Sequence, residues 1–246
     1  MKEVKVCLVG SGRAGMIHGH NLAGSVPGGK IIAVCDPVGN VAENAAKELG
    51  IDLFYKDYHD VMKNEEIDAV IIACPTKFHK EITVAAANAG KHVFCEKPMA
   101  MNEDECDEMI NAAKENNVKL QIGFMRRFDE SFQEAKRMIE AGEIGEVVSV
   151  KSHTRGPSKP KEWMYDISIS NGPLGEVCSH DIDTVRWFSG SEISSLYAVG
   201  GNYRNKEIAD KYPDFYDNVI MSVEFENGMQ GVVEGAQYVQ YGYDAR

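Results

Sequence analysis

Short apolar segments alternate with amphipathic segments along the first half of the 246-residue chain. The apolar segments are rich in β-branched residues, as is typical of parallel strands that are covered on both faces. This alternation predicts a doubly wound α/β domain with a parallel sheet. The predicted strands are Val4–Val9, Ile31–Cys35, Ala69–Ala73, His92–Cys95 and Val118–Ile122, and the predicted helices include Ala42–Leu49, Lys77–Ala89 and Asp104–Asn116.

The pattern changes after about Ile122, where the strands become longer and a hairpin signal appears. Asn227-Gly228 separates two strand-like segments, and this dipeptide is a strong predictor of a tight antiparallel turn. We therefore predict two domains, with residues 1–122 forming a Rossmann domain and residues 123–246 forming a second α/β domain. The second domain is predicted to contain helices Phe128–Ala141 and His180–Phe188 and strands Val147–His153, Ser195–Tyr203, Asn218–Phe225 and Met229–Val239.

Charge and hydropathy exclude several classes of protein. The formal net charge is −12, which argues against broad nucleic-acid binding because phosphates require a positive surface. It also argues weakly against an anionic membrane surface. No apolar segment approaches the roughly 20 residues that a membrane span requires, and no signal peptide precedes the first strand. We expect a soluble, cytoplasmic protein.

The six cysteines do not form a metal or disulfide pattern. No two of them make a C-x-x-C pair, and Cys7, Cys35, Cys74 and Cys95 lie in or at the end of predicted strands. Buried thiols of a protein in a reducing compartment are the simplest interpretation. Because no clustered ligands accompany them, we predict no metal site.

A glycine-rich turn follows the first predicted strand and precedes a helix. This G-x-G-x-x-G spacing permits a tight turn, a close backbone approach to a pyrophosphate and close helix–strand packing, and the helix N-terminus offers free N–H groups to phosphate oxygens. A glycine-rich turn without a ligand is the alternative. The residues predicted to bind the cofactor here are Gly10, Ser11, Gly12, Arg13, Ala14 and Gly15.

Asp36 ends the second predicted strand and is placed to accept hydrogen bonds from the hydroxyls of a ribose. Its negative charge would oppose a 2′-phosphate, and Pro37 rather than an arginine follows it. The sequence therefore favours NAD over NADP. A turn carboxylate before a proline is the alternative interpretation of Asp36.

Further motifs follow in order along the whole chain. They are Ala73-Cys74-Pro75-Thr76 with His79, Glu96-Lys97-Pro98, Gly123-Phe124-Met125-Arg126-Arg127-Phe128-Asp129, Ser179-His180-Asp181-Ile182-Asp183 and Tyr241-Gly242-Tyr243-Asp244. With the fingerprint, they resemble the glucose–fructose oxidoreductase / inositol dehydrogenase (Gfo/Idh/MocA) family, and within it the inositol dehydrogenase branch. The resemblance implies a second domain with a largely antiparallel open sheet. Family members run on beyond the last residue of this sequence, so the resemblance also implies that the second domain is incomplete here.

The resemblance implies oxidation of a secondary hydroxyl of a polyol or sugar, with hydride passing to NAD. In this interpretation His180 is the base that takes the hydroxyl proton, and Lys97 stabilises the developing alkoxide. Glu176 is the third residue expected in the catalytic site. It lies four residues before His180, so in one continuous helix both side chains would share a face, and its carboxylate would orient the imidazole or bind a substrate hydroxyl. The inositol dehydrogenase branch usually has Asp at this position. Packing at a helix start and a solvated loop lysine are the alternatives for His180 and Lys97.

The resemblance also assigns binding roles to other residues. Cofactor contacts beyond the fingerprint and Asp36 are expected from Cys74, Pro75, Thr76, His79, Glu96, Lys97 and Arg126. Substrate contacts are expected from Lys97, Arg127, Arg155, His180 and Tyr243. A homo-oligomer, either a dimer or a tetramer, is implied by the family. A redox-cycling glycosidase that retains its NAD and a non-catalytic NAD-binding sensor are the alternative functions.

Overall fold

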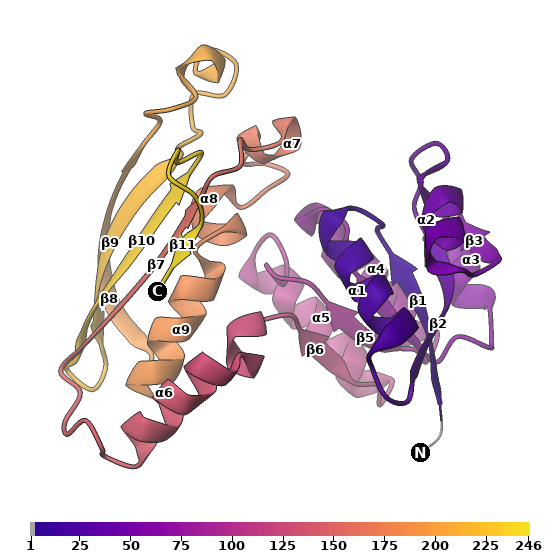
Figure 1. The fold of residues 1–246 in the computed structure, drawn as a ribbon, viewed down its shortest axis with the longest axis horizontal. Helices are drawn as coiled ribbons and strands as arrows, with labels where there is room; N and C mark the ends of the chain where they lie inside the picture. The colour runs from indigo at the N-terminus through magenta and orange to yellow at the C-terminus, as the bar shows by residue number, and fades with distance from the viewer. Residues whose placement is uncertain (1–2) are drawn as a thin grey trace. The chain divides into compact units, whose positions relative to one another are not determined.

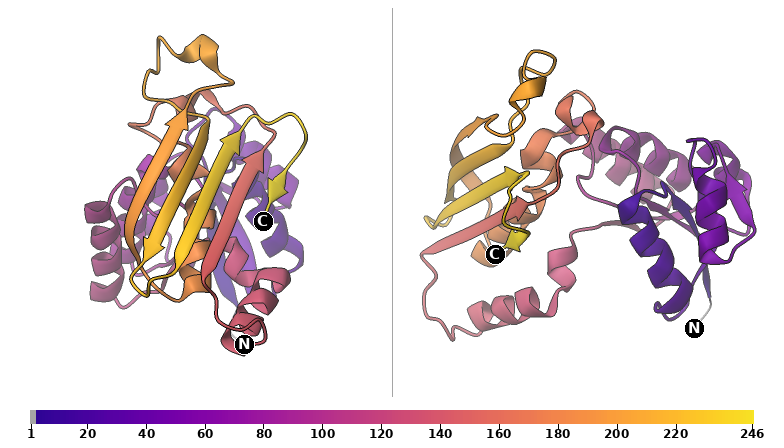
Figure 2. Two further views of the ribbon diagram at one scale, coloured as in Figure 1. Left: turned by 90° about the vertical axis from the view of Figure 1, so that its left-hand side faces the viewer. Right: turned by 45° about the horizontal axis from the view of Figure 1, so that its top comes forward.

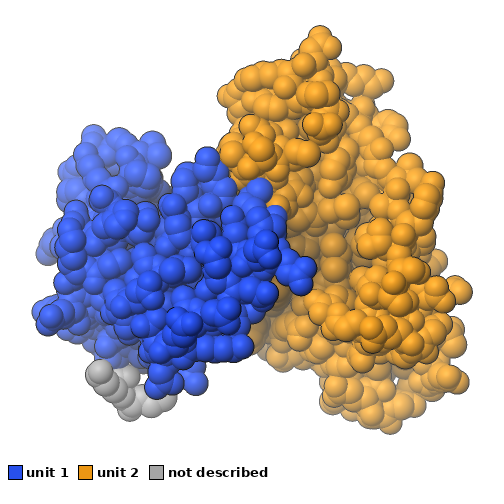
Figure 3. Space-filling model, turned by 180° about the vertical axis from the view of Figure 1, so that it is seen from behind, with its two compact units in different colours: residues 1–123 blue, residues 124–246 orange. Residues whose placement is uncertain are grey.

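The computed structural model describes residues 3–246, and the chain divides into two compact units, Met1–Gly123 and Phe124–Arg246 (Figure 3). Each unit contains one sheet with helices packed against it (Figure 1). No helix in the described part of the chain is both long enough and apolar enough to cross a membrane.

Unit 1 is a doubly wound Rossmann fold, as the sequence predicts. Its six strands are all parallel and lie in the order β3-β2-β1-β4-β5-β6. The chain order reverses between β1 and β4, and ligands of such sheets bind outside the carboxyl ends of the strands at this point. The strands are β1 Val4–Val9, β2 Gly29–Cys35, β3 Leu53–Tyr55, β4 Ala69–Ile72, β5 His92–Cys95 and β6 Leu120–Ile122. The helices are α1 Arg13–Gly24, α2 Val41–Leu49, α3 Tyr58–Lys63, α4 His79–Asn88 and α5 Glu103–Glu115, with a 3-10 turn at Thr76–Phe78.

Two separate cores hold the helices of unit 1 on the two faces of its sheet. Successive residues of a strand point to opposite faces, and β1 follows this rule. Leu8 packs with residues of α1 and α2, whereas Cys7 and Val9 pack with residues of α3, α4 and α5. Burial of each large aliphatic side chain contributes about 1.5–3 kcal/mol, so the apolar β-branched pattern of these strands fixes a doubly covered sheet.

Local signals in the sequence account for two helix ends in unit 1. The side chain of Asn102 accepts a hydrogen bond from the backbone N–H of Glu105 (3.0 Å), and Glu105 Oε2 accepts one from the N–H of Met101 (3.0 Å). This reciprocal pair caps the start of α5, as the spacing of Asn102 and Glu105 predicts. Gly90 follows the end of α4 with a φ of +72°, a conformation that suits glycine.

Unit 2 contains a mixed, mostly antiparallel sheet of five strands in the order β11-β7-β10-β9-β8. The hairpin predicted at Asn227-Gly228 joins β9 to β10, and Gly228 has a φ of +84°. The exception to antiparallel pairing is β7, which runs parallel to β10. The strands are β7 Ser149–Gly156, β8 Ile193–Gly201, β9 Asn218–Phe225, β10 Gln230–Gln237 and β11 Asp244–Ala245. The helices are α6 Glu130–Glu140, α7 Glu162–Tyr165, α8 Gly172–Glu176 and α9 Ser179–Ser189, with 3-10 turns at Met125–Phe128 and Lys206–Ile208.

The two faces of the unit 2 sheet differ in burial. Alternate residues of β9 are buried and exposed, so one face enters the core of unit 2 and the other faces solvent. Helices α8 and α9 pack on the buried face, and the opposite face is open in the left view of Figure 2. Large apolar side chains are exposed on β8 and β9, namely Leu196, Tyr197, Val199 and Ile220.

Candidate active site

Two of the three glycines in the fingerprint turn of unit 1, Gly10 and Gly15, occupy positions that tolerate no side chain. Gly10 has a φ of +91°, and a Cβ there would lie 2.6 Å from the backbone nitrogen of Cys74. A Cβ on Gly15 would lie 1.9 Å from the carbonyl oxygen of Gly10. These contacts hold the start of α1 tightly against the ends of β1 and β4, as a dinucleotide-binding turn requires.

Gly12 differs from the other two glycines because it faces open space. A Cβ built on Gly12 would meet nothing within 4 Å, and Gly12 precedes the first residue of α1. A phosphate can therefore approach the backbone N–H groups at the positive end of the helix. The fingerprint residues fit the pyrophosphate of a dinucleotide.

Asp36 lies beside this turn at the end of β2 and is 8% exposed. Its Oδ2 accepts hydrogen bonds from the backbone N–H (3.0 Å) and hydroxyl (3.3 Å) of Ser11, and its Oδ1 accepts one from the N–H of Val38 (3.0 Å). A carboxylate has about four acceptor sites, so Asp36 retains the capacity to accept a hydrogen bond from a ribose hydroxyl. Its charge and position fit the adenosine ribose of NAD.

Replacing Asp36 by alanine is expected to weaken NAD binding by about tenfold to a hundredfold, since a hydrogen bond to a charged group is lost. Affinity for NADP should fall less, because the charge that opposes a 2′-phosphate is removed as well. The two affinities are measured by titrating each dinucleotide into the protein and recording the fluorescence of the protein. Asp52→Ala removes an exposed carboxylate and is the matched control. Unchanged affinity of Asp36→Ala for both dinucleotides would remove Asp36 from the site.

The segment after β4 carries the predicted Cys74, Pro75, Thr76 and His79, of which Thr76 and His79 are buried. The ring of His79 is 1% exposed, with Nδ1 2.8 Å from the carbonyl oxygen of Pro98 and Nε2 2.9 Å from that of Cys74. This ring links the loops that follow β4 and β5. Burial raises the pKa of the Cys74 thiol to about 12, so the thiol is uncharged. The predicted cofactor contacts of these residues remain predictions.

Glu96 and Lys97 form the loop that follows β5. Oε1 of Glu96 accepts a hydrogen bond from Nε2 of His18 on α1 (2.7 Å), and Oε2 accepts one from the backbone N–H of Lys97 (3.2 Å). Burial alone would raise the pKa of Glu96. The hydrogen bond and charge of His18, together with the charge of Lys97, outweigh burial and lower that pKa below its usual value. Glu96 is therefore a carboxylate that is fixed next to Lys97.

In unit 2, His180 lies in the first turn of α9 and is partly exposed. Its ring meets that of Phe124 edge to face, with centroids 6.3 Å apart, and its carbonyl accepts a hydrogen bond from Thr184 (2.7 Å). The next residue, Asp181, is fully buried and pairs with Arg126 at 2.8 Å. The helix that carries His180 is thereby anchored by a buried ion pair.

Arg126, which the resemblance predicts to bind cofactor, is 3% exposed in unit 2. Besides Asp181, its guanidinium donates to the hydroxyls of Ser152 (3.0 Å) and Thr154 (2.6 Å) on β7. These contacts tie the segment after Phe124 to β7 and α9. Removal of one partner from such a buried pair costs about 3–5 kcal/mol, so the observed contacts give Arg126 a structural role. Its cofactor role remains a prediction.

Besides Lys97 and His180, three residues are predicted to contact the substrate, and they lie at different places in unit 2. Arg127 makes a two-bond ion pair with Asp183 (2.9 Å and 2.9 Å), and Arg155 on β7 pairs with Glu234 at 2.6 Å. Tyr243, next to β11, is 64% exposed. Arg127 and Arg155 therefore hold carboxylates already, and their substrate contacts remain predictions.

The sequence spacing would place Glu176 and His180 on one face only if both belonged to one continuous helix. The structure shows that they do not. Glu176 is the last residue of α8, and His180 belongs to α9, which begins at Ser179. At the break, the N–H of Cys178 bonds to the carbonyl of Pro173 (3.0 Å), a spacing wider than that of an α-helix. The four-residue spacing therefore does not by itself place both side chains on one face. A role for Glu176 remains a prediction.

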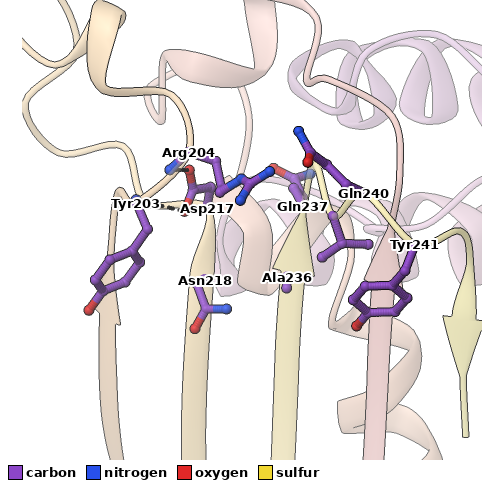
Figure 4. Close-up of a pocket in the computed structure, with 9 residues that line it drawn as sticks. Tyr203, Arg204, Asp217, Asn218, Ala236, Gln237, Gln240 and Tyr241 are labelled. Carbon is purple, nitrogen blue, oxygen red and sulfur yellow. Dashed lines mark hydrogen bonds between the residues drawn. The ribbon is translucent and has the colours of Figure 1, made fainter.

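Unit 2 also contains a pocket of about 460 Å³ at one end of its sheet (Figure 4). Arg204, Asp217 and Gln237 lie near one another among its lining residues, with Tyr203 on one side of them and Tyr241 on the other. Asp217 is fully buried and accepts backbone hydrogen bonds from Tyr203 (2.9 Å) and Arg204 (2.7 Å). None of the residues predicted from the sequence to form the site lines this pocket.

Metal-ligating residues do not gather within residues 3–246. No group of three or more His, Cys, Asp or Glu side chains in this range is arranged to hold a metal ion. All six cysteines are free thiols, and Cys7, Cys35, Cys95 and Cys178 are buried.

Comparison with known families identifies the class of protein. Residues 4–124 match the model described as "Oxidoreductase family, NAD-binding Rossmann fold", and residues 132–246 match the "GFO/IDH/MocA C-terminal domain". The chain belongs to the Gfo/Idh/MocA family of NAD-binding oxidoreductases.

Several relatives of the chain are inositol dehydrogenases. The chain is 38% identical over 244 residues to scyllo-inositol 2-dehydrogenase (NAD(+)) of Bacillus subtilis, covering 99% of this chain and 70% of that protein. It is 33% identical to myo-inositol 2-dehydrogenase of Thermotoga maritima, covering 99% of this chain and 71% of that protein. The crystal structure of scyllo-inositol dehydrogenase from Lactobacillus casei with bound NAD(H) and scyllo-inositol superimposes with a TM-score of 0.87 at 30% identity, covering 99% of this chain and 72% of that one.

Sequence reasoning missed His18, which contacts Glu96 across 78 positions of the chain. His18 follows the fingerprint by three residues on α1. Only the folding of unit 1, which also places the His18 ring against Phe94 of β5, brings it to Glu96. Its position on the same helix as the fingerprint is the one signal that singles it out.

Proposed function

We propose that this protein is an NAD-dependent dehydrogenase that oxidises a secondary hydroxyl of a cyclic polyol or sugar of the inositol type. The proposal is supported by two features that occur together in this chain. A nucleotide-binding turn that fits NAD occurs in a chain that is 38% identical to an inositol dehydrogenase over nearly its whole length and retains Lys97 and His180 at the motif positions.

The chemistry assigns different tasks to the cofactor and to the chain. NAD, when bound, supplies the acceptor for the hydride that leaves the substrate carbon. His180 takes the proton of the reacting hydroxyl, and an imidazole suits this task near neutral pH. Lys97 donates a hydrogen bond to the same oxygen and stabilises its developing negative charge.

The remaining hydroxyls of a polyol require polar partners that fix its orientation. Arg127, Arg155 and Tyr243 are the proposed partners. The ion pairs of Arg127 with Asp183 and of Arg155 with Glu234 hold the guanidinium groups in defined positions, and each guanidinium has five N–H donors, so donors remain available to a ligand.

We propose NAD rather than NADP as the cofactor. Asp36 is anchored on Ser11 and Val38, so its negative charge is fixed where the adenosine ribose of a dinucleotide is expected. A 2′-phosphate would meet this carboxylate, whereas the two ribose hydroxyls of NAD can donate to it.

The function is tested with a panel of inositols and aldoses. The formation of NADH is monitored by its near-ultraviolet absorbance. The native protein is expected to accumulate NADH with one class of cyclic polyol and with NAD in preference to NADP. NAD binding without any NADH formation would contradict the dehydrogenase. Release of the leaving group from a glycoside added to the assay would favour the redox-cycling glycosidase, and the absence of any turnover would favour an NAD-binding sensor.

We further propose that the protein assembles into a homo-oligomer through the open face of the unit 2 sheet. On this face, Tyr197 and Val199 of β8 and Ile220 of β9 have exposed fractions of 71%, 55% and 53%. Apolar side chains gathered on a surface favour association. A monomeric mass in light scattering at micromolar concentration would contradict this assembly.

A further inference from the structure

The backbone around Lys97 is restrained on both sides by histidines that belong to two different helices of unit 1. After Lys97, the carbonyl of Pro98 lies 2.8 Å from Nδ1 of the buried His79 on α4. Before Lys97, the carboxylate of Glu96 accepts hydrogen bonds from Nε2 of His18 on α1 (2.7 Å) and from the N–H of Lys97 itself (3.2 Å). The chain on either side of Lys97 is thus attached to α1 and α4.

The carboxylate of Glu96 has little room to move away from this position. The side chains of His18 and Glu96 are 24% and 20% exposed, so water competes weakly for their hydrogen bond. Gly123, at the end of β6, lies so close to this carboxylate that a Cβ added to it would be 3.2 Å from Oε2 of Glu96. His18 is itself fixed by Phe94, whose ring it meets edge to face at 5.1 Å.

Loss of the His18 hydrogen bond would change the electrostatics around Lys97 as well as its geometry. A carboxylate without its imidazole partner is free to turn toward the neighbouring Lys97 ammonium. An ion pair formed there would compete with the substrate oxygen for the same donor. A misplacement of about 1 Å at a reacting group lowers turnover by about a hundredfold.

From these contacts we infer that His18 is a positioning residue, which acts through Glu96 to hold Lys97 in the orientation that the proposed reaction requires. This inference rests on the proposed function for its kinetic consequence, but the restraint itself belongs to unit 1. His18 lies in the second turn of α1, beyond the fingerprint glycines, so its removal should spare NAD binding.

Two substitutions separate the hydrogen bond of His18 from its packing. His18→Phe keeps a ring against Phe94 and removes the donor to Glu96. His18→Gln places an amide N–H near the position of Nε2 and restores a donor. His20→Phe is the matched control, because His20 lies on the same helix and pairs with Glu48 at 2.9 Å in an exposed position.

In the native protein, His18→Phe is expected to lower kcat about tenfold to a hundredfold, with the Kd for NAD changed by less than about threefold. His18→Gln should recover most of the rate, and His20→Phe should match the wild type. Hydrogen exchange of the Lys97 amide, measured by mass spectrometry without substrate or cofactor, should be faster in His18→Phe and normal in His18→Gln.

A kcat of His18→Phe within about twofold of the wild type, with unchanged exchange at Lys97, would overturn the inference. So would a parallel loss of NAD affinity that His18→Gln does not restore, because His18 would then serve the cofactor helix. If the wild type oxidises no polyol, the proposed function fails, and the exchange rates alone decide whether His18 restrains Lys97.

Discussion

Lys97→Met is expected to lower kcat by about a hundredfold to a thousandfold, the effect of removing one donor from a developing oxyanion. Methionine preserves the length and most of the volume of the lysine stem, so the loop after β5 should keep its fold. Because Oε2 of Glu96 accepts a hydrogen bond from the backbone N–H of residue 97, the restraint of the loop should survive the substitution.

The measurement for Lys97→Met is single-turnover formation of NADH together with a separate titration of NAD. The expected result is a large loss of rate with an NAD affinity within about threefold of the wild type. Lys114→Met on α5 removes an exposed lysine and is the control. A variant that retained nearly the full rate on its best substrate would exclude Lys97 from the chemistry.

His180→Ala is expected to lower turnover by about a hundredfold to ten-thousandfold near neutral pH, the usual contribution of a positioned general base. The rate should rise again at high pH, because hydroxide can then take the proton that His180 takes in the wild type. Helix α9 should remain in place, since the Arg126–Asp181 pair that anchors it does not involve the His180 ring.

The pH dependence of kcat for His180→Ala, compared with that of the wild type, measures this effect. His59→Ala removes an exposed imidazole of unit 1 and is the control. A pH profile of undiminished height that is superimposable on that of the wild type would exclude His180 as the base.

The fold was predictable where hydrophobic burial controls it. The strand β1 begins and ends where its apolar pattern does, and β5 and β9 agree equally well. The short elements β3 and α3 were missed because little of them is buried, and Leu53 and Phe54 of β3 are each 38% exposed. The parallel pairing of β7 with β10 was also missed, because residue pattern within a strand does not specify the direction of its neighbour.

Within the candidate site, the geometry that could be predicted is the part that a local motif determines. The fingerprint glycines have the geometry that their spacing predicts, and Asp36 lies beside them. The pair of His18 and Glu96 depends instead on packing between segments far apart in the sequence. The helix break between Glu176 and His180 likewise depends on local backbone bonds to Pro173 that a spacing rule does not include.

The central claim is that a hydride passes from a polyol carbon to NAD, and transfer of deuterium tests it most directly. The native protein is incubated with NAD and an inositol that carries deuterium on its ring carbons, and both products are analysed by mass spectrometry. We predict a reduced cofactor that carries the label, formed in equal amount with the corresponding ketone. Bound NAD that acquires no deuterium from any polyol or sugar of the panel would contradict the claim.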